Sequence, residues 1–502
     1  MPIPFKEDPL EVNQRLLFPT NVFDLLQKDH DCFIFDDICR HIETSSIESD
    51  FSAIGQRAYH PRRIVSILIY AYAHGVFSSR QIEKRCHEDL GFMYIAHLGC
   101  PNFRVLSDFR KKYHEFFHAC FKQSVLLAVE AGLASFGSVA LDGSKFQANT
   151  SKHKAMSYGR LKEREKELTE EIEALLAKAQ KCDEEEDQDD GEKTGYEIPE
   201  ELKIKEKRLA KIKAAKEALE KREKEIAPEK EIEDKKQISF ADKEARIMGK
   251  KGSFEYAYNG QISVDKDNQI IVGEHLTQNA NDKKEVEPAL EAMKETTGSL
   301  PKIMSMDNGY FSGENLATLQ ETSIDAHVAP GKEGKKDPVP LESSDRKVQK
   351  ADFVYQAEGD CFQCPAGQTL HLASSGEEGK KVYRGHDEIC AGCPYHTRCC
   401  HSKEGKARSI SSDDKEPLRQ AMMEKMGRED AKETYKDRKQ IVEPVFGQIK
   451  NSGFRRFSVR GFQAARGEFS LVCAVHNFKK IVRALVRGVV RPQTWKRAVA
   501  AA

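Results

Sequence analysis

The sequence predicts an α/β protein that carries an all-helical N-terminal domain and two insertions of unlike composition. Three observations support this fold class. Helical patterns fill the first part of the chain, short apolar runs of strand type then alternate with helical patterns, and a Lys/Glu-rich segment and a cysteine-rich segment interrupt that alternation. Alternating strands and helices are typical of a sheet covered by helices. At 502 residues the chain is also too long for one ordinary core, so several domains are expected.

The predicted domain boundaries follow these changes in composition and pattern. They are 1–135 for the helical domain, 136–157 and 237–350 for the core, 158–236 for a helical hairpin, 351–405 for a cysteine-rich insertion, 406–488 for C-terminal core helices and 489–502 for a basic tail. The core is thus interrupted twice, and its parts must come together in space.

Residues 1–135 are predicted to be a helical DNA-binding domain. Pro61 opens an apolar helical stretch, Ser78 or Ser79 is placed to cap the helix after it, and Ser107 is expected to cap another. Short helices with tight turns and basic residues at their starts are typical of helix-turn-helix-like DNA modules. Many all-helical domains without DNA share this pattern.

Two acidic residues follow strand patterns of the core. Asp142 ends the apolar run of a strand at 138–147, and Asp307 lies near the end of a strand at 302–310. An acid at the carboxyl end of a strand projects from the edge where α/β proteins place their sites. The remaining expected elements are a strand hairpin at 256–265 and 269–278, a helix at 283–296 and a short strand at 325–330.

A third acid, Glu443, lies in a predicted helix near the C-terminus. Tyr435, Lys439 and Glu443 recur every four residues and Lys450 follows seven later, so the four fall near one helix face. Pro444 is expected to disturb this helix locally. Three carboxylates suit the two divalent ions that phosphodiester cleavage uses, and oxygen ligands suit Mg²⁺ or Mn²⁺.

The sequence resembles the DDE transposases of insertion sequences, whose third acid lies in a Tyr-Arg-Glu-Lys signature. The resemblance covers about residues 57–480 and rests on RRIVSILIYAYAHGVFSSRQIEKRC, VALDGSKFQANTSK, IMSMDNGYFSGENL, and YKDRKQIVEPVFGQIK with GFRRFSVRGFQAARGEFSLVCAVHNFKKI. For the basic position of the signature, Arg438 has the expected sequence spacing from Tyr435, and Lys439 has the expected sequence spacing from Glu443. The helix face favours Lys439.

The resemblance implies an RNase-H-like catalytic core in which Asp142, Asp307 and Glu443 hold Mg²⁺ or Mn²⁺. Such an enzyme binds terminal inverted repeats, cleaves the DNA and joins the 3′-hydroxyl ends to target DNA. Double-stranded DNA is then the partner, with a homodimer in the synaptic complex. The residues expected to contact the DNA backbone include Tyr435, Lys439 and Lys450. Two alternatives stay open, namely a nuclease of the same fold without strand transfer and a non-catalytic DNA-binding scaffold.

The charge distribution indicates a polyanion-binding surface in the C-terminal region. The chain has a net charge of −1, yet residues 444–502 hold twelve Lys/Arg and one acid, which gives +11. Arg455 and Arg456 are its predicted DNA contacts, although a solvated basic tail would show the same charge. There is no run of 18 apolar residues and no apolar stretch near Met1, so neither a membrane span nor a secretory signal is expected. A cytoplasmic, nucleoid-associated protein is expected.

Residues 158–236 are predicted to form an antiparallel helical hairpin of coiled-coil type. Leu161, Leu168 and Leu175 are seven residues apart, and the second half repeats this spacing up to Ile226. The acidic stretch 183–192 lies between the two halves. A solvated structural arm is the simpler interpretation, and an arm for dimerisation or for clamping DNA is the alternative.

The cysteine-rich insertion holds six of the thirteen cysteines and is predicted to bind a structural Zn²⁺ as a zinc-ribbon-like module. Spacing alone selects two CxxC pairs, Cys361/Cys364 and Cys390/Cys393. Resemblance to related transposases selects Cys364, Cys390, Cys393 and Cys399. Both tetrads stay open, with His386, His396 and His401 as substitutes. Reduced thiols without a metal are the alternative.

Overall fold

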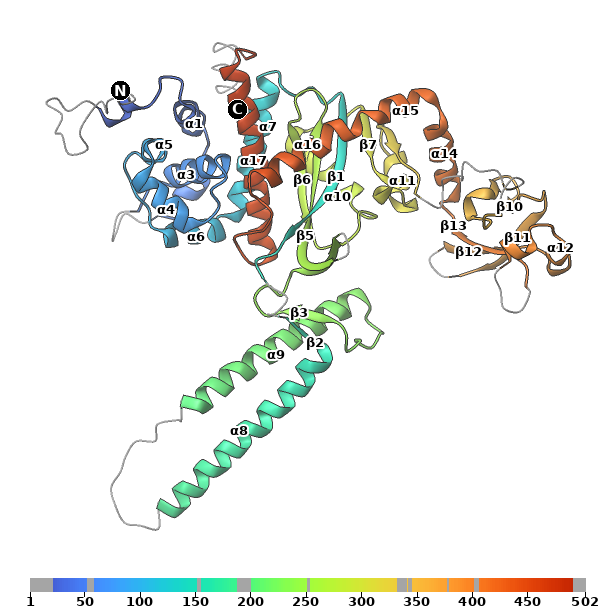
Figure 1. Cartoon of the computed structure of the whole chain (residues 1–502), viewed down its shortest axis with the longest axis horizontal. Helices are drawn as coiled ribbons and strands as arrows, with labels where there is room; N and C mark the ends of the chain where they lie inside the picture. Colours follow the sequence, from blue (N-terminus) through green and yellow to red (C-terminus); the bar gives the residue numbers. More distant parts are fainter. Residues whose placement is uncertain are drawn as a thin grey trace, which may run out of the picture. The chain divides into compact units, whose positions relative to one another are not determined.

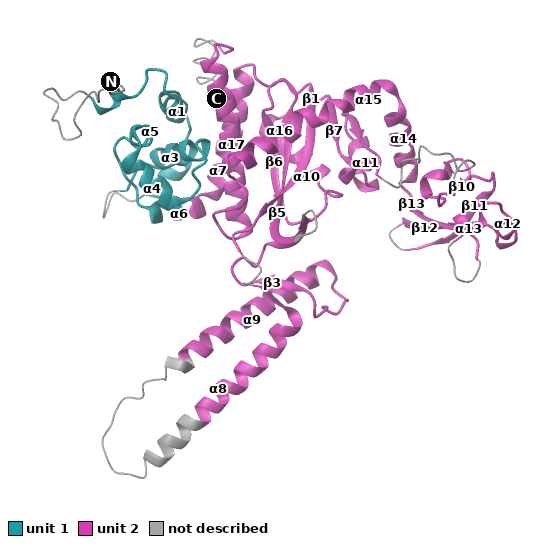
Figure 2. Cartoon of the chain, viewed as in Figure 1, with its two compact units in different colours: residues 1–109 teal, residues 110–502 magenta. Residues whose placement is uncertain are grey.

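The computed structural model describes residues 21–51, 58–150, 155–186, 200–250, 253–331, 341, 345–376, 379–400 and 406–490. His401, most of the acidic stretch 183–192 and the tail from 491 lie outside these residues. The chain divides into two compact units, Met1–Phe109 and Arg110–Ala502 (Figure 2). The sequence analysis drew its first boundary at 135 instead. The difference is helix α7 (His114–Glu130), which packs along α17 (Phe462–Val486) within the second unit.

The first unit is a helical bundle built around α3 (Pro61–Ala73). Its other elements are η1 (Val22–Leu25), α1 (Asp31–Arg40), α2 (Ser45–Glu48), α4 (Ser79–Glu88), α5 (Leu90–Ile95) and α6 (Phe103–Lys112), which runs across the boundary. Apart from Arg62 and Arg63, every residue of α3 is buried. A helix that is apolar on almost all sides must be surrounded by others, so α3 forms the centre of this unit.

The helix starts in this unit match the sequence patterns with one exception. Pro61 is the first residue of α3, and α4 begins directly after Ser78. The prediction that Ser107 caps a helix is wrong, because Ser107 lies inside α6. Asn102 supplies the cap instead, since its side-chain oxygen accepts hydrogen bonds from the backbone nitrogens of Arg104 and Val105, each at 3.0 Å.

A six-stranded sheet forms the centre of the second unit (Figure 1). Its strands are β1 (Ser138–Gln147), β4 (Arg246–Lys250), β5 (Ser253–Asp265), β6 (Ile271–Thr277), β7 (Ile303–Met306) and β8 (Asp325–Val328). The order is β4-β5-β1-β7-β8, with β6 also paired to β5. β1, β7 and β8 are parallel, and β5 is antiparallel to both β1 and β6. Consequently β6, β1, β7 and β8 all run in one direction.

Helices α10 (Val286–Thr297) and α17 cover opposite faces of this sheet. A Cβ at Gly260 of β5 would lie 2.6 Å from the Phe469 ring of α17, and a Cβ at Gly273 of β6 would lie 2.6 Å from the Met293 side chain of α10. Gly260 pairs with Leu276, three residues from Gly273, and side chains alternate along a strand. Glycine at these two positions therefore lets both helices approach the sheet closely.

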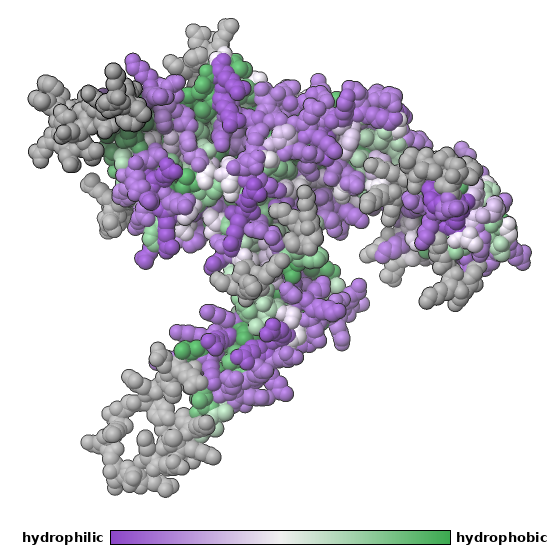
Figure 3. All heavy atoms as spheres, viewed as in Figure 1, coloured by the Kyte–Doolittle hydropathy of each residue, from purple (hydrophilic) through white to green (hydrophobic). Residues whose placement is uncertain are grey.

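The helical hairpin consists of α8 (Tyr158–Glu186) and α9 (Glu200–Ile226), joined to the rest by a two-stranded ladder of β2 (Ala155–Ser157) and β3 (Gln237–Ser239). Leu161, Leu168, Ile212 and Leu219 are buried against each other in a cluster of their own. Ile226, the last residue in this spacing, does not join the cluster, since it is 71% exposed. Hydrophilic side chains cover the outer sides of the hairpin, with hydrophobic ones between its helices (Figure 3).

The cysteine-rich insertion contains a five-stranded antiparallel sheet that the sequence analysis did not predict. Its order is β13-β12-β11-β10-β9. The elements are η6 (Lys350–Asp352), β9 (Val354–Gln356), β10 (Cys361–Gln363), β11 (Thr369–Ser375), β12 (Lys380–Arg384), α12 (Asp387–Ala391), α13 (His396–Cys399) and β13 (Ser409–Asp413). Phe362, Leu370, Tyr383 and Ile410 form the centre of its core. The insertion therefore buries a hydrophobic core that does not depend on sulfur alone.

The remaining elements of the second unit complete the predicted alternation. They are η3 (Asn308–Tyr310), α11 (Gly313–Gln320), α14 (Glu416–Gly427), α15 (Glu429–Lys436) and α16 (Arg438–Asn451). No helix within the described ranges is long and apolar enough to cross a membrane.

Excision of residues 158–236, with closure by a short Gly/Ser linker, is expected to leave a cooperative thermal transition in the rest of the chain. Ser157 and Gln237 are paired neighbours, so a short linker can join them, and the hairpin buries its leucines in its own cluster. Circular dichroism during heating measures this. Loss of the cooperative transition would show that the hairpin is part of the core.

Candidate active site

Asp142 and Asp307 lie side by side on neighbouring parallel strands. Leu141 of β1 pairs with Met306, the last residue of β7, so the next residue on each strand is the acid. β1 continues to Gln147 beyond this point, whereas the chain after β7 turns into η3. The two carboxylates therefore meet where one strand of the pair ends.

Backbone amides hold both carboxylates. Asp142 Oδ1 accepts a hydrogen bond from the backbone nitrogen of Gly143 at 2.9 Å. Asp307 caps η3, and its Oδ1 accepts from the backbone nitrogen of Gly309 at 2.8 Å. Each acid thus has one oxygen directed to the backbone.

Helix α16 brings Arg438 and Glu443 to these acids. Arg438 Nη1 lies 3.4 Å from Asp142 Oδ2, and Arg438 Nη2 lies 4.0 Å from Glu443 Oε1. The Arg438 side chain is 6% exposed and the Glu443 side chain 53% exposed. The guanidinium therefore stands between the first and third acids, with Glu443 on the solvent side.

The proline after Glu443 is accommodated by a side chain from the β5–β6 turn. Pro444 lies inside α16 and cannot donate to the carbonyl of Gln440, four residues earlier. Gln269 Nε2 donates to that carbonyl at 3.0 Å. The disturbance predicted at Pro444 is thus compensated, and α16 continues without a break to Asn451.

The site is rich in negative charge. The pKa of Asp142 is raised to about 6, mainly by burial. The charge of Arg438 lowers this pKa, and the charge of Asp307 raises it. Burial disfavours the charged form of Arg438, yet the negative charge of Asp142 raises the Arg438 pKa overall. A single buried cation therefore does not balance the carboxylates.

Tyr435 and Lys450 flank the acids, whereas Lys439 is exposed. The Arg438 guanidinium lies 5.9 Å from the centre of the Tyr435 ring. The Lys450 ammonium donates to the hydroxyl of Ser144, two residues after Asp142. The basic side chain that lies between Asp142 and Glu443 is therefore that of Arg438 and not that of Lys439. A contact between Lys439 and DNA stays a prediction.

Arg455 and Arg456 are exposed in a segment that extends the edge of β1. The backbone nitrogen of Gln147 donates to Arg455 O at 3.0 Å, and the backbone nitrogen of Phe457 donates to Gln147 O at 2.9 Å. Arg456 Nη2 donates to the carbonyl of Thr150 at 3.1 Å. This ladder fixes the basic segment to the strand that carries Asp142.

A fourth acid, Asp282, was missed by the sequence analysis. Its Oδ1 accepts hydrogen bonds from Asn259 Nδ2 at 2.9 Å and from Gln261 Nε2 at 2.6 Å. Burial raises the pKa of Asp282, and the charge of Asp307 raises it further. Its position after a strand was a usable signal, since Asp282 follows β6 and β6 runs in the same direction as β1 and β7. The direction of β6 is known, however, only once the pairings of β5 with β1 and with β6 are known.

The donor set fits a hard divalent cation, since Asp142, Asp307 and Glu443 offer only carboxylate oxygens and excess negative charge. Within the described ranges, however, no three His, Cys, Asp or Glu side chains are arranged to hold a metal ion. At this site the reason is plain, because the Arg438 guanidinium lies between Asp142 and Glu443. Coordination would require that guanidinium to shift.

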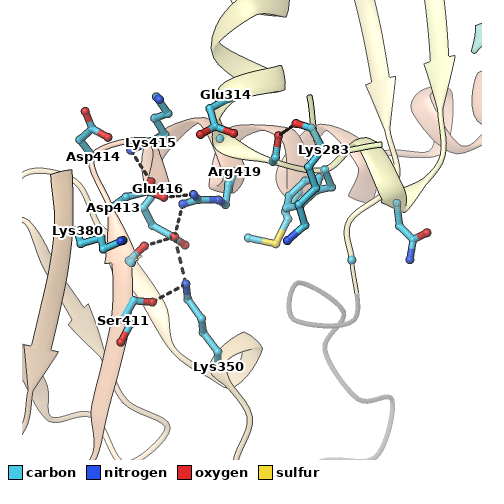
Figure 4. Close-up of a pocket in the computed structure, with 17 residues that line it drawn as sticks. Lys283, Glu314, Lys350, Lys380, Ser411, Asp413, Asp414, Lys415, Glu416 and Arg419 are labelled. Atoms are coloured by element: carbon cyan, nitrogen blue, oxygen red, sulfur yellow. Dashed lines mark hydrogen bonds and ion pairs between the residues drawn. The ribbon is translucent and has the colours of Figure 1, made fainter. Parts of the chain in front are cut away.

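A cavity of about 700 Å³ opens beside the turn that follows Asp307. Asn308 and Lys283 line it from the core, and Figure 4 shows Glu416, Arg419 and Lys350 on its other side. Buried Glu416 accepts from Arg419 at 2.9 Å and from Lys350 at 3.4 Å. This network ties α14 to the cysteine-rich sheet. Because the lining carries both signs of charge, it does not by itself indicate an anion site.

Five of the cysteines line one small cavity of the insertion. These are Cys364, Cys390, Cys393, Cys399 and Cys400. Cys361 is outside that lining and donates from Sγ to Gln356 Oε1 at 3.6 Å. Burial raises the pKa of Cys399 to about 12, so this thiol is protonated at neutral pH. Of the two predicted tetrads, the one with Cys399 surrounds a common space.

The variant Asp142→Asn is expected to be more stable than the wild type above about pH 6 in a chelating buffer. The pKa of Asp142 is about 6 in the folded protein and about 3.9 in an unfolded chain. Ionisation therefore destabilises the fold as the pH rises from about 4 to about 6. The gain is at most about 3 kcal/mol, since one pKa unit corresponds to about 1.4 kcal/mol. Thermal unfolding across this pH range measures it.

The two proteins should unfold alike below about pH 4, where Asp142 is protonated in both states. Asp267→Asn, at an exposed turn, is the control and should show no such gain. A variant at Asp142 that is less stable than the wild type near pH 7 would contradict the charge balance described above.

Comparisons with known protein families match two parts of the chain. A transposase DDE domain matches residues 363–482, which include Glu443 but neither Asp142 nor Asp307. A second transposase domain (DUF772) matches residues 20–112, which include the whole described part of the first unit. No curated protein and no solved structure matches the chain. The two domain matches, one in each unit, support its assignment to the DDE transposases of insertion sequences.

Proposed function

We propose that this transposase binds the terminal inverted repeats of an insertion sequence, cleaves the DNA with divalent metal ions and transfers the 3′-hydroxyl ends to target DNA. The observation that carries the proposal is the single buried guanidinium of Arg438 between Asp142 and Glu443, with Asp307 beside Asp142. Three acids from distant parts of the chain meet at the carboxyl ends of two parallel strands, where an oxygen-liganded metal centre is expected.

An RNase-H-like core is part of this proposal. The path β6-β5-β1-β7-β8, with only β5 reversed, and the helices on both faces support it. In such a core Asp142 and Asp307 lie on the two central parallel strands and Glu443 comes from a later helix. The strand order and the positions of the three acids in this chain are what such a core would have.

Asp142, Asp307 and Glu443 would hold Mg²⁺ or Mn²⁺, which activates the attacking oxygen and stabilises the leaving oxygen. Water attack at phosphorus breaks the bond to the 3′-oxygen and leaves a 3′-hydroxyl and a 5′-phosphate. That hydroxyl then attacks a phosphodiester of the target, forms a new bond to its phosphorus and releases the target's own 3′-oxygen as a hydroxyl. Arg438 pairs with Asp142 in this structure, and its guanidinium, once shifted from that place by the cation, would bind a phosphate oxygen.

Double-stranded DNA at transposon ends and target is the proposed partner. Tyr435 and Lys450 flank the acids, and the exposed Arg455 and Arg456 lie at the end of β1; all four would contact phosphates. Lys439 would reach the backbone from the exposed side of the helix. The helical first unit is proposed to add DNA contacts of its own. A homodimer in the synaptic complex and a nucleoid-associated location remain expectations.

The variant Asp307→Asn is expected to lose DNA cleavage while it keeps DNA binding. Asparagine removes the charge that would hold the cation and also lowers repulsion of phosphate, so affinity should stay equal or rise. Cleavage of end-bearing DNA with Mg²⁺ and a binding titration measure the two effects. Cleavage at the wild-type rate would exclude Asp307 as a metal ligand.

The complementary variant replaces Arg455, Arg456 and Arg460 by Ala. Each lost phosphate contact lowers the slope of log affinity against log salt by about 0.9 on duplex DNA. Binding should weaken alike on all sequences, because phosphate contacts do not read bases. An unchanged slope would place the DNA path elsewhere on the protein.

We also propose one structural Zn²⁺ per chain, held by Cys364, Cys390, Cys393 and Cys399, because these cysteines surround one cavity. Cys390→Ser is expected to abolish zinc retention in protein purified under reducing conditions. Cys361→Ser is the matched control and should retain zinc, since Cys361 is outside the cavity lining. Elemental analysis of the folded proteins measures this. Absence of zinc from the folded wild type would exclude the site.

A further inference from the structure

The proposed function uses three of the four acids that gather at the carboxyl ends of β6, β1 and β7, and Asp282 is the fourth. Both of its hydrogen bonds from side chains, from Asn259 and Gln261, end on the same oxygen, Oδ1. The other oxygen, Oδ2, has no hydrogen bond from any residue that the structure describes. A carboxylate held on one side only has a defined orientation and a free oxygen.

That free oxygen lies near the Asp307 carboxylate. A Cβ at Gly309 would lie 3.0 Å from Asp282 Oδ2 and 2.9 Å from Asp307 Oδ1. Two carboxylates from different loops thus approach the same point. On the other side, a Cβ at Gly143 would lie 2.9 Å from Asp282 Oδ1. Glycine beside each of the two strand-end acids leaves the room that Asp282 occupies.

Two amide side chains tie Asp282 to the turn that carries Asp307. Gln261, which donates to Asp282, also accepts from the hydroxyl of fully buried Tyr310. Asn315 Nδ2 donates to the backbone carbonyls of both Asp282, at 3.3 Å, and Tyr310, at 2.9 Å. A displacement of Asp282 would therefore also displace the turn from Asp307 to Tyr310.

We propose that Asp282 is a positioning residue for Asp307. Asp282 fixes the turn that carries Asp307 and places a second negative charge beside the Asp307 carboxylate. Both effects help Asp307 to retain a divalent cation. The inference rests on the proposed function, in which Asp307 holds that cation. Residues that orient a ligand from behind typically contribute about 10–100-fold to metal affinity. The alternative is that Asp282 only anchors the loop between β6 and α10.

The test is Mn²⁺ binding to the full chain by isothermal titration, with Asp282→Asn as the main variant. Asparagine keeps an oxygen that can accept from Asn259 and Gln261 but removes the charge. Mn²⁺ affinity is expected to fall about 10–100-fold, while the metal-free melting temperature stays equal or rises, because burial raises the pKa of Asp282 and so disfavours its charged form. Asp307→Asn is the positive control, and Asp267→Asn removes an equal charge at a distant turn and should bind as the wild type does.

The outcomes separate the two proposals. Wild-type affinity in Asp282→Asn, with affinity lost in Asp307→Asn, would overturn the positioning role and leave the proposed function intact. Wild-type affinity in both variants would overturn the metal centre itself. If Asp282→Asn does not fold, carbodiimide labelling of the wild type gives the answer. Mn²⁺ should protect Asp282 together with Asp307 but not Asp267, and equal labelling of Asp282 with and without Mn²⁺ would refute the role.

Discussion

Crowding of like charges at the carboxyl ends of three strands is the constraint on which the rest of this structure depends. Asp142, Asp282 and Asp307 are partly buried there, and Arg438 is the buried cation that stands against Asp142. Such an arrangement is stable only because each carboxylate has hydrogen bonds of its own and because the pKa of two of them rises. The energetic cost is a reason to look for function here, since perturbed acids concentrate at functional sites.

The surroundings can be understood as ways of meeting that constraint. Glycines at 143 and 309 make room for the carboxylates, and Gln261 and Asn315 satisfy polar groups that burial would otherwise leave unpaired. Helix α16 must then present Arg438 accurately despite Pro444. Gln269 makes this possible by taking the carbonyl that the proline leaves free.

Much of the core could be predicted because its patterns are local. Strand β1 was predicted with its correct limits, and α10 and β8 within a few residues, since alternation, capping residues and turns fix such elements. Asp142, Asp307 and Glu443 could be predicted as a group because each stands in a recognisable position in the sequence, and the structure brings all three to Arg438 or its neighbour Asp142. The role of Arg438 was not predicted, because helix periodicity ranked Lys439 above it and only the fold shows which of the two is buried. Asp282 could not be recognised without the directions of the strands, which the sequence does not show.

The sheet of the cysteine-rich insertion was missed because its strands are short and polar, and they pair across long turns.

The ladder between Gln147 and the segment 455–457 has a consequence for assembly. Beyond Leu141, β1 no longer pairs with β7, so within the described structure this side of β1 pairs with no other strand before the bridge between Gln147 and Arg456. An open strand edge invites a strand from another molecule. Here the chain's own C-terminal segment takes the last position, at Gln147, with two backbone hydrogen bonds. Within the described structure, this contact therefore occupies the end of the β1 edge that a strand from a second copy would otherwise reach.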